Sequence, residues 1–319
     1  MVRRRDWMAA LLVAGLALLG RPWPAAFPAE VPAWEQFTLP PGDWTTVPPA
    51  QPGGAGDPVL EVHVPAAGDG EAVLVRCGGR AVLIGAGGPW AGPRVAAYLD
   101  RAGVRRLEAV VIAHDAPYHV GGVPYVLERI PVNAVHDAVR TSAEPAHREA
   151  LRAVTAAGIA YRQVRGGDRW DLGCGGIRAL TPLVEGDGED VQPGPLADTG
   201  AALLVHSPQV RVLLAGSLGA EGEEALTRVY PDLTVDVLVV GRRGHRTATS
   251  AVLLERAAPR LAVIPVGPYN EEGRPHADVL ERLEAAGVRV YRTDRDGTIQ
   301  MTAAPRGPRV RLVPPQPPP

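Results

Sequence analysis

The chain has 319 residues, of which 46% are hydrophobic, and this is enough to bury one large core or two small ones. Its 33 basic and 35 acidic residues are well mixed and give a formal net charge of -2 at pH 7, so there is no strong electrostatic signature of nucleic-acid binding. Only 5% of the residues are aromatic, so Val, Leu and Ala must fill the core.

The N-terminal region has the pattern of a targeting signal. Arg3, Arg4 and Arg5 precede a short apolar run that extends from Trp7 to Gly20. This run is shorter than the ~20 apolar residues that a membrane-spanning helix needs, and it fits a secretory signal. We therefore predict a signal peptide or an uncleaved signal-anchor at 1–27. Either would make the rest of the chain extracytoplasmic, secreted or anchored to the membrane.

Segments of biased composition enclose the body of the chain. Residues 28–58 are rich in Pro and Gly and predict an extended linker. Residues 304–319 are also rich in Pro and predict a disordered tail. The folded domain is expected between them, at 59–303.

Strands and helices alternate along this body. Alternating or unbroken apolar runs predict strands, and apolar residues that recur every three or four positions predict helices. The expected strands are 59–64, 71–77, 80–88, 107–114, 134–138, 176–183, 201–207, 210–217, 235–241, 261–267, 288–293 and 298–303. The expected helices are 94–104, 123–130, 145–159, 220–230, 250–259 and 276–288. Hairpins come first and strand–helix units follow in each half, which predicts an α/β fold with two mixed sheets between helices.

The segment from Val110 to Gly122 carries the most specific pattern. An apolar strand ends in His114, His119 follows five residues later, and a Gly pair comes next. This segment resembles the H-x-H-x-D-H-x-G-G frame of the metallo-β-lactamase family, in which two His and an Asp-His pair converge on one or two zinc ions. The resemblance implies an αββα sandwich, two mixed β-sheets flanked by helices, over about residues 59 to 303.

Other segments resemble the hydrolase-like domain of ComEC-type competence proteins, which act in DNA uptake. The family phrases D-V-G-Q-G-D-A, L-I-D-G-G, L-L-T-G-D and V-G-H-H-G-S align with residues 66–72, 83–88, 213–217 and 240–245. The closing phrases P-H-P-x-V-L and V-Y-R-T-D-x-D-G are nearly intact at 275–280 and 290–297. Many segments thus agree in chain order, and this agreement extends the resemblance along nearly the whole body.

The departures from the family pattern fall on the metal ligands. The second His of the motif, its Asp, the bridging Asp and the late His pair are replaced by Ala116, Tyr118, Ser217 and Arg242-Arg243. A catalytic zinc takes about three protein ligands, and only His114 and His119 remain of the motif. One arginine ~4 Å from a dication costs roughly 8 kcal/mol at an effective dielectric near 20, which two histidines do not easily offset. We therefore expect no family-type metal site.

The first functional hypothesis is a non-catalytic domain, a pseudoenzyme, whose mouth binds a small anion or a phosphodiester segment. Guanidinium groups in place of metal ligands keep the positive charge, and they bind phosphate or carboxylate through two parallel hydrogen bonds. The predicted anion-binding residues are Arg242, Arg243 and His245, near His114 and His119. The membrane is a further partner if the N-terminal segment is not cleaved.

The alternative is an active metal-dependent hydrolase, of phosphodiesterase or nuclease type, with a rearranged site. Its zinc or manganese ligands would be His114, His119, Asp115 and His245, and the metal would activate a water molecule. A third possibility is metal-free acid–base catalysis by Asp115 with His114 or His119.

The chain contains two cysteines, Cys77 and Cys174. They form neither a C-x-x-C motif nor a zinc-ribbon spacing, which argues against a structural zinc. We predict two unpaired small residues, and pairing stays open for a chain outside the cytoplasm.

Overall fold

The computed structural model describes residues 58–68, 70–181, 184–185, 192–193, 200–268, 270 and 272–314. The predicted signal or anchor at 1–27, and the predicted linker apart from Pro58, lie outside the described residues. Within the described residues, no helix has both the length and the apolar character that crossing a membrane requires.

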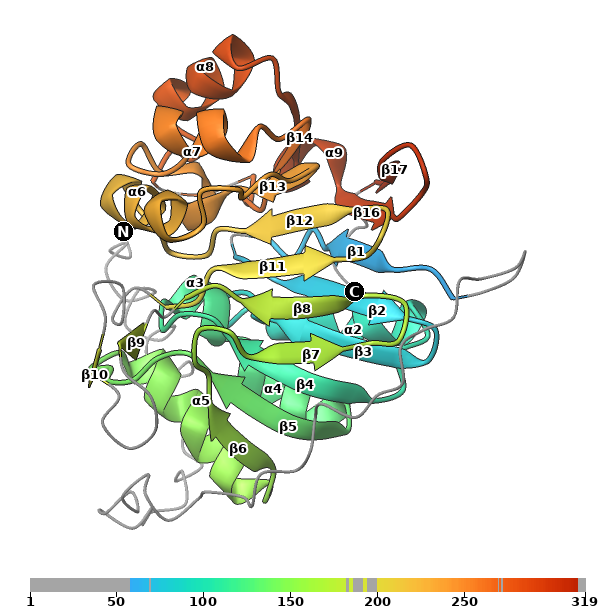
Figure 1. Cartoon of the computed structure of the whole chain (residues 1–319). Helices are drawn as coiled ribbons and strands as arrows, with labels where there is room; N and C mark the ends of the chain where they lie inside the picture. The colour runs from blue at the N-terminus through green and yellow to red at the C-terminus, as the bar shows by residue number, and fades with distance from the viewer. Residues whose placement is uncertain are drawn as a thin grey trace, which may run out of the picture. The chain divides into compact units, whose positions relative to one another are not determined.

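The first sheet combines strands from both ends of the described body (Figure 1). Its order is β17-β16-β1-β2-β3-β4-β5-β6. The strands are β1 (Glu61–Val64), β2 (Val73–Cys77), β3 (Arg80–Ile84), β4 (Leu107–Ile112), β5 (Val132–Asp137), β6 (Ala160–Gln163), β16 (Thr298–Thr302) and β17 (Arg309–Val313). Strands β1 to β3 are antiparallel neighbours, whereas β3 to β6 run parallel. Because β4 lies between parallel neighbours and is covered on both faces, its sequence is an apolar run from Ala109 to Ile112 after the half-buried Glu108.

The second sheet has the order β15-β14-β13-β12-β11-β8-β7. Its strands are β7 (Arg169–Asp171), β8 (Gly176–Ala179), β11 (Leu203–His206), β12 (Arg211–Leu214), β13 (Val237–Val239), β14 (Leu261–Ile264) and β15 (Arg289–Arg292). Strands β12 to β15 run parallel. A separate two-stranded pair consists of β9 (Val184–Glu185) and β10 (Gln192–Pro193).

Helices cover the outer faces of the two sheets (Figure 1). The first sheet packs against α2 (Gly92–Arg101), α4 (Val123–Arg129) and α5 (Pro145–Ala156). The second sheet packs against α6 (Ala220–Val229), α7 (Ala251–Ala257) and α8 (Ala277–Ala285). A third apolar layer fills the space between the sheets. The short helices are α3 (Pro117–Val120), η3 (Gly241–Gly244) and α9 (Thr293–Asp296). This arrangement confirms the predicted α/β sandwich.

Some of the differences from the predicted elements lie at sheet edges. The sequence pattern does not predict β6 and β7, which are short strands at the edges of their sheets. The prediction of a disordered tail over 304–319 is wrong for Arg309–Val313, because this segment pairs antiparallel with β16. An exposed edge strand in which Arg alternates with apolar residues buries too little to give a strong sequence signal.

A disulfide joins the two sheets. Cys77 ends β2 in the first sheet, and Cys174 lies in the turn between β7 and β8 in the second. Their Cα atoms are 6.0 Å apart and their sulfurs are bonded, across a sequence separation of 97 residues. The prediction of two unpaired cysteines is therefore wrong. No local motif marks the pair, because only the packing of one sheet on the other brings the two turns together.

A buried histidine in β5 links the sheets by a second contact. The Nε1–H of Trp170 in β7 donates a hydrogen bond of 2.6 Å to Nδ1 of His136. Burial, followed by the charge of Arg162, lowers the pKa of His136 to about 4. The ring is therefore neutral in the folded protein at pH 7.

Because the pKa of His136 is lowered by burial, we expect the folded protein to lose stability in acid. The unfolded chain takes up a proton on His136 near its usual pKa of 6.5, whereas the folded chain takes it up only near 4. The stabilisation is therefore complete above pH 6.5 and is lost as the pH falls toward 4, by on the order of 3 kcal/mol for this residue. The variant His136→Gln keeps an acceptor for Trp170 and does not titrate. Urea unfolding at pH 7 and pH 4.5 should show a smaller pH dependence in the variant; equal dependences would contradict the assignment.

Candidate functional site

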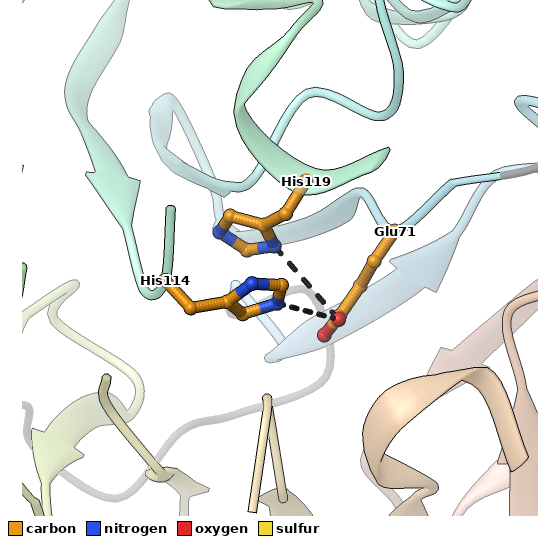
Figure 2. A group of neighbouring side chains, drawn as sticks. All are labelled: Glu71, His114 and His119. Carbon is orange, nitrogen blue, oxygen red and sulfur yellow. Dashed lines mark hydrogen bonds and ion pairs between the residues drawn. The ribbon is translucent and has the colours of Figure 1, made fainter. Parts of the chain in front are cut away.

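Three buried side chains meet where the carboxyl end of β4 faces the start of β2 (Figure 2). Glu71 precedes β2, His114 follows β4, and His119 lies in α3. Their ligand-type atoms all lie within 4.8 Å of one another. The Nε2 atom of His114 is 3.4 Å from Oε2 of Glu71, and the Nδ1 atom of His119 is 3.8 Å from the same oxygen. We call this group the Glu71 cluster.

The backbone around the Glu71 cluster is tightly fitted. The N–H of Glu71 donates to the carbonyl of Tyr118 over 2.9 Å, and the N–H of Gly87 donates to the carbonyl of Glu71 over 2.9 Å. Gly85 has a φ of +64°, and a Cβ atom there would lie 2.6 Å from the ring of His119. Only glycine fits this position, since any side chain would also be strained at that φ. The glycine therefore permits His119 to lie against the turn after β3.

The hydrogen bond from Ala113 fixes the proton of His119. The backbone N–H of Ala113 donates to Nε2 of His119 over 3.0 Å. A neutral imidazole that accepts through Nε2 carries its proton on Nδ1. The Nδ1–H group therefore points its proton toward Glu71, and no lone pair remains at the atom that faces the cluster.

Charge within the cluster resides on Glu71. Burial raises the pKa of the Glu71 carboxyl, but the hydrogen bond from His114 and the nearby ring of His119 outweigh this effect and hold the pKa well below its usual value. Burial, together with His119, lowers the pKa of His114 to about 4. At neutral pH the cluster thus contains one carboxylate and one neutral imidazole on His114 that donates to it.

A metal fits the cluster in ligand number but not in protonation. Three ligand atoms match the number that a catalytic zinc takes from a protein. However, Nδ1 of His119 must lose its proton to bind a metal, and moving that proton to Nε2 would set two N–H groups against each other at Ala113. The residues as placed therefore do not fit a zinc or manganese ion.

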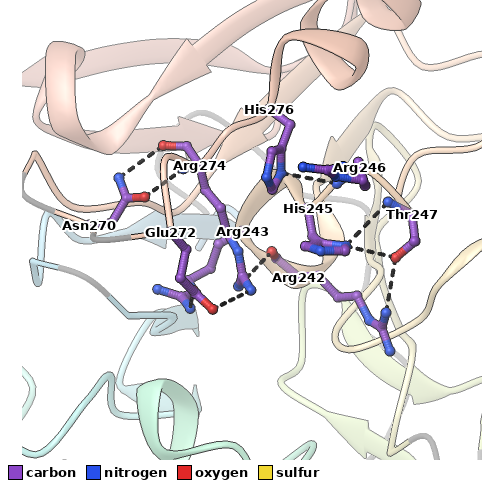
Figure 3. A network of polar contacts seen from close by, with 9 residues as sticks. All are labelled: Arg242, Arg243, His245, Arg246, Thr247, Asn270, Glu272, Arg274 and His276. Atoms are coloured by element: carbon purple, nitrogen blue, oxygen red, sulfur yellow. Dashed lines mark hydrogen bonds and ion pairs between the residues drawn. The ribbon is translucent and has the colours of Figure 1, made fainter.

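Arginines gather in the loops that follow β13 and β14 of the second sheet (Figure 3). We call these loops, together with the Glu71 cluster, the mouth. Arg242 and Arg243 lie in η3, and both have left-handed backbone conformations, with φ of 51° and 56°. Two successive non-glycine residues in this region cost about 1–2 kcal/mol each and persist only where contacts hold them. For Arg243 those contacts include the ring of Tyr118, whose centroid is 3.9 Å from the guanidinium carbon, and an ion pair with Glu272.

A second arginine shares the carboxylate of Glu272. The guanidinium of Arg274 donates to Glu272 over 2.8 Å and to the carbonyl of Arg242 over 3.2 Å. It also lies 5.9 Å from the centre of the Tyr118 ring. Tyr118 also contacts His114, with ring centroids 5.4 Å apart. Tyr118 therefore links the anionic Glu71 cluster to a group of two guanidiniums and one carboxylate.

Other predicted site residues have partners elsewhere. Arg242 donates to the carbonyl of Ser217 over 2.8 Å and to Oγ1 of Thr247 over 3.0 Å, and His245 hydrogen-bonds to the same hydroxyl over 2.9 Å. Asp115 accepts a hydrogen bond of 2.7 Å from Ser142. Within the described ranges, neither Asp115 nor His245 joins the metal-capable group of Glu71, His114 and His119. The structure therefore brings His114 and His119 together with Glu71, and it does not bring Asp115 or His245 to them.

Three residues of the mouth are missing from the sequence prediction. Glu71 stands at the last acidic position of the phrase aligned with residues 66–72, so a signal for it was present. Glu272 and Arg274 precede the phrase at 275–280 and match no motif residue. Only the path of the loop after β14 brings them to Tyr118 and Arg243.

A two-sheet αββα sandwich, with a histidine-containing mouth at the carboxyl end of β4, defines the class of metallo-β-lactamase-like folds. The chain belongs to the metallo-beta-lactamase superfamily, because the sequence model of that family matches residues 66–267.

Competence proteins are among its relatives. The chain is 28% identical to ComE operon protein 3 of Bacillus subtilis (strain 168) over 203 residues, which are 64% of this chain and 25% of that protein. It is 31% identical to Competence protein ComA of Neisseria gonorrhoeae over 236 residues, 73% of this chain and 31% of that protein. The chain thus spans less than a third of the length of the curated relatives it matches, and the resemblance to ComEC-type proteins is confirmed.

The chain is also similar to solved structures. The metallo-beta-lactamase fold protein YhfI from Bacillus subtilis aligns with a TM-score of 0.49 and 7% sequence identity, covering 76% of this chain and 99% of that one.

Proposed function

We propose that this domain is a non-catalytic, ComEC-like member of the superfamily whose mouth binds a small oxyanion or a phosphodiester segment. The carrying observation is the buried guanidinium of Arg243, which lies over Tyr118 and is paired with a carboxylate. A guanidinium that already binds one carboxylate has the geometry to bind another oxyanion. Binding would take place around Arg243, because the Glu71 cluster is itself anionic and repels a second negative charge.

The loss of catalysis in this proposal follows from protonation and charge. His119 directs an N–H toward Glu71, and Arg243 occupies the late His pair of the family pattern. Both features oppose a dication. Asp115 is engaged by Ser142 and is not part of the cluster, so the proposal assigns no acid–base role to it.

The proposed location is extracytoplasmic, secreted or anchored by the N-terminal segment. The disulfide between Cys77 and Cys174 supports it, since disulfides form and persist in oxidising compartments and are rare in the cytoplasm.

Anion binding is tested by calorimetric titration with inorganic phosphate and with a deoxydinucleotide that contains one phosphodiester. We expect Arg243→Ala to weaken binding at least about tenfold, because a charge-assisted bidentate contact is lost. Arg243→Lys keeps the charge but not the planar fork and should bind with intermediate affinity. Arg228→Ala, which removes an exposed guanidinium on α6, is the matched control. Unchanged binding by folded Arg243→Ala protein would overturn the proposal.

A second candidate function is metal-dependent hydrolysis of a phosphodiester on the Glu71 cluster. The approach of three ligand atoms to within 4.8 Å is the observation that favours it. A zinc or manganese ion there would lower the pKa of a bound water. This candidate requires the hydrogen bond between Ala113 and His119 to break, so metal content separates it from the first proposal.

A further inference from the structure

One carboxylate lies between the two guanidiniums of the mouth. Glu272 forms ion pairs with Arg243 and with Arg274 (Figure 3). The exposed fractions of the three side chains differ sharply: 3% for Arg243, 11% for Arg274 and 50% for Glu272. Arg243 is thus buried and Arg274 is mostly covered, while the carboxylate that pairs with them is half in solvent.

Each guanidinium also has a contact that does not involve Glu272. Arg243 lies over the Tyr118 ring, and Arg274 donates to the carbonyl of Arg242. The Nε atom of Arg274 is buried and has no hydrogen-bond partner within the described part of the chain. A pair of fixed guanidiniums is preorganised for an oxyanion with two or more oxygens, because little side-chain freedom is lost on binding.

The loop that carries Glu272 is also held independently of its carboxylate. The side-chain oxygen of Asn270 accepts from the N–H of Arg274 over 2.5 Å, and its amide donates to the carbonyls of Gly267 and Arg274 over 3.0 and 2.9 Å. These bonds close the turn around position 272 without using the side chain of Glu272. The carboxylate can therefore leave the arginines while the loop backbone keeps its course.

We propose that Glu272 is a built-in substitute for the ligand, and that an external phosphate group displaces it and binds across Arg243 and Arg274. This inference rests on the proposed function, since it takes the same mouth to be the anion site, and it adds Arg274 as a binding residue and Glu272 as a competitor. Carboxylate and phosphate share the chemistry that a guanidinium pair recognises. A phosphate dianion has more charge and more acceptor oxygens than a carboxylate, so it competes better with Glu272.

The test compares Glu272→Gln with the wild-type full chain by calorimetric titration with inorganic phosphate and, separately, with acetate. Removing the competing charge should tighten phosphate binding at least about tenfold, with phosphate preferred over acetate. Glu272→Asp keeps the charge on a shorter side chain and should give a smaller gain. The matched control is Glu224→Gln, an exposed carboxylate paired with Arg228 on α6, which should bind like wild type. Adding Arg274→Met to Glu272→Gln should abolish the gain.

The outcomes separate this inference from the proposed function. If Arg243→Ala weakens phosphate binding but Glu272→Gln binds no more tightly than wild type, the anion site stands and the role of Glu272 is overturned. If folded wild type and folded Glu272→Gln both fail to bind phosphate and acetate, both proposals are overturned. A gain in Glu272→Gln that survives the added Arg274→Met change would overturn the role of Arg274.

Discussion

Replacing Cys77 and Cys174 by Ser lowers the free energy of unfolding by about 4–5 kcal/mol. The expected size follows from the sequence separation of 97 residues, because a cross-link over so long a loop removes much conformational freedom from the unfolded chain. The link also joins a turn of each sheet, so its loss frees the end of the sandwich. Denaturant unfolding of the oxidised wild type and the double variant measures the difference.

Reduction of the wild type supplies the internal control for this prediction. A reducing agent should shift the wild-type unfolding midpoint to that of the double variant and leave the variant unchanged. Thiol titration of the unfolded, non-reduced wild type should detect no free cysteine. Two free thiols per chain, or identical midpoints with and without reductant, would show that the two sheets are not cross-linked.

Replacing Glu71 by Ala lowers the free energy of unfolding by about 3–5 kcal/mol. The change removes a buried carboxylate, leaves the Nε2–H group of His114 without its acceptor, removes the carboxylate that faces Nδ1 of His119, and opens a cavity. Glu71→Gln keeps the shape and one acceptor oxygen, so we expect a loss of only about 1–2 kcal/mol. Urea unfolding at pH 7 compares the two variants with wild type.

The same carboxylate gives a pH dependence with a definite sign. The pKa of Glu71 is lowered in the folded state, so its stabilisation is present above the usual value of 4.5 and is lost as the pH falls below it. Glu71→Gln should lack this acid loss. Equal stabilities of wild type and Glu71→Ala at pH 7 would mean that the cluster does not form as described.

The sheets were predictable because their residues repeat a simple pattern. Strand β4 is a buried parallel strand, and the apolar run from Ala109 to Ile112 is enough to identify it. Helix α5 shows its apolar side chains at helical spacing, and Gly158 follows its end. Edge strands such as β17 are not predicted, because their alternation of Arg and apolar residues also fits an exposed tail.

The mouth was predictable only where the chain keeps motif positions. His114 and His119 were found by their spacing, and the structure places them in contact, with ring centroids 4.0 Å apart. The motif does not show which way a replacement side chain points, so the sequence predicts one shared role for Arg242 and Arg243. Their guanidiniums have different partners, because Arg242 binds the carbonyl of Ser217 while Arg243 lies over Tyr118.

No sequence pattern predicts which ring nitrogen of His119 carries the proton. It follows from one backbone N–H, that of Ala113, which faces the ring nitrogen away from Glu71. This contact depends on the path of the chain between β4 and α3. It is also the feature that most strongly separates the mouth described here from a metal-binding one.

The most direct test of the central claim, that this mouth binds anions and not metals, is elemental analysis of untagged protein equilibrated with zinc and manganese and then freed of unbound ions. We predict less than about a tenth of an equivalent of either metal, because His119 offers no lone pair to the cluster and a guanidinium occupies the late His pair. About one equivalent per chain, lost in both His114→Ala and Glu71→Gln, would contradict the claim and favour the metal-dependent hydrolase.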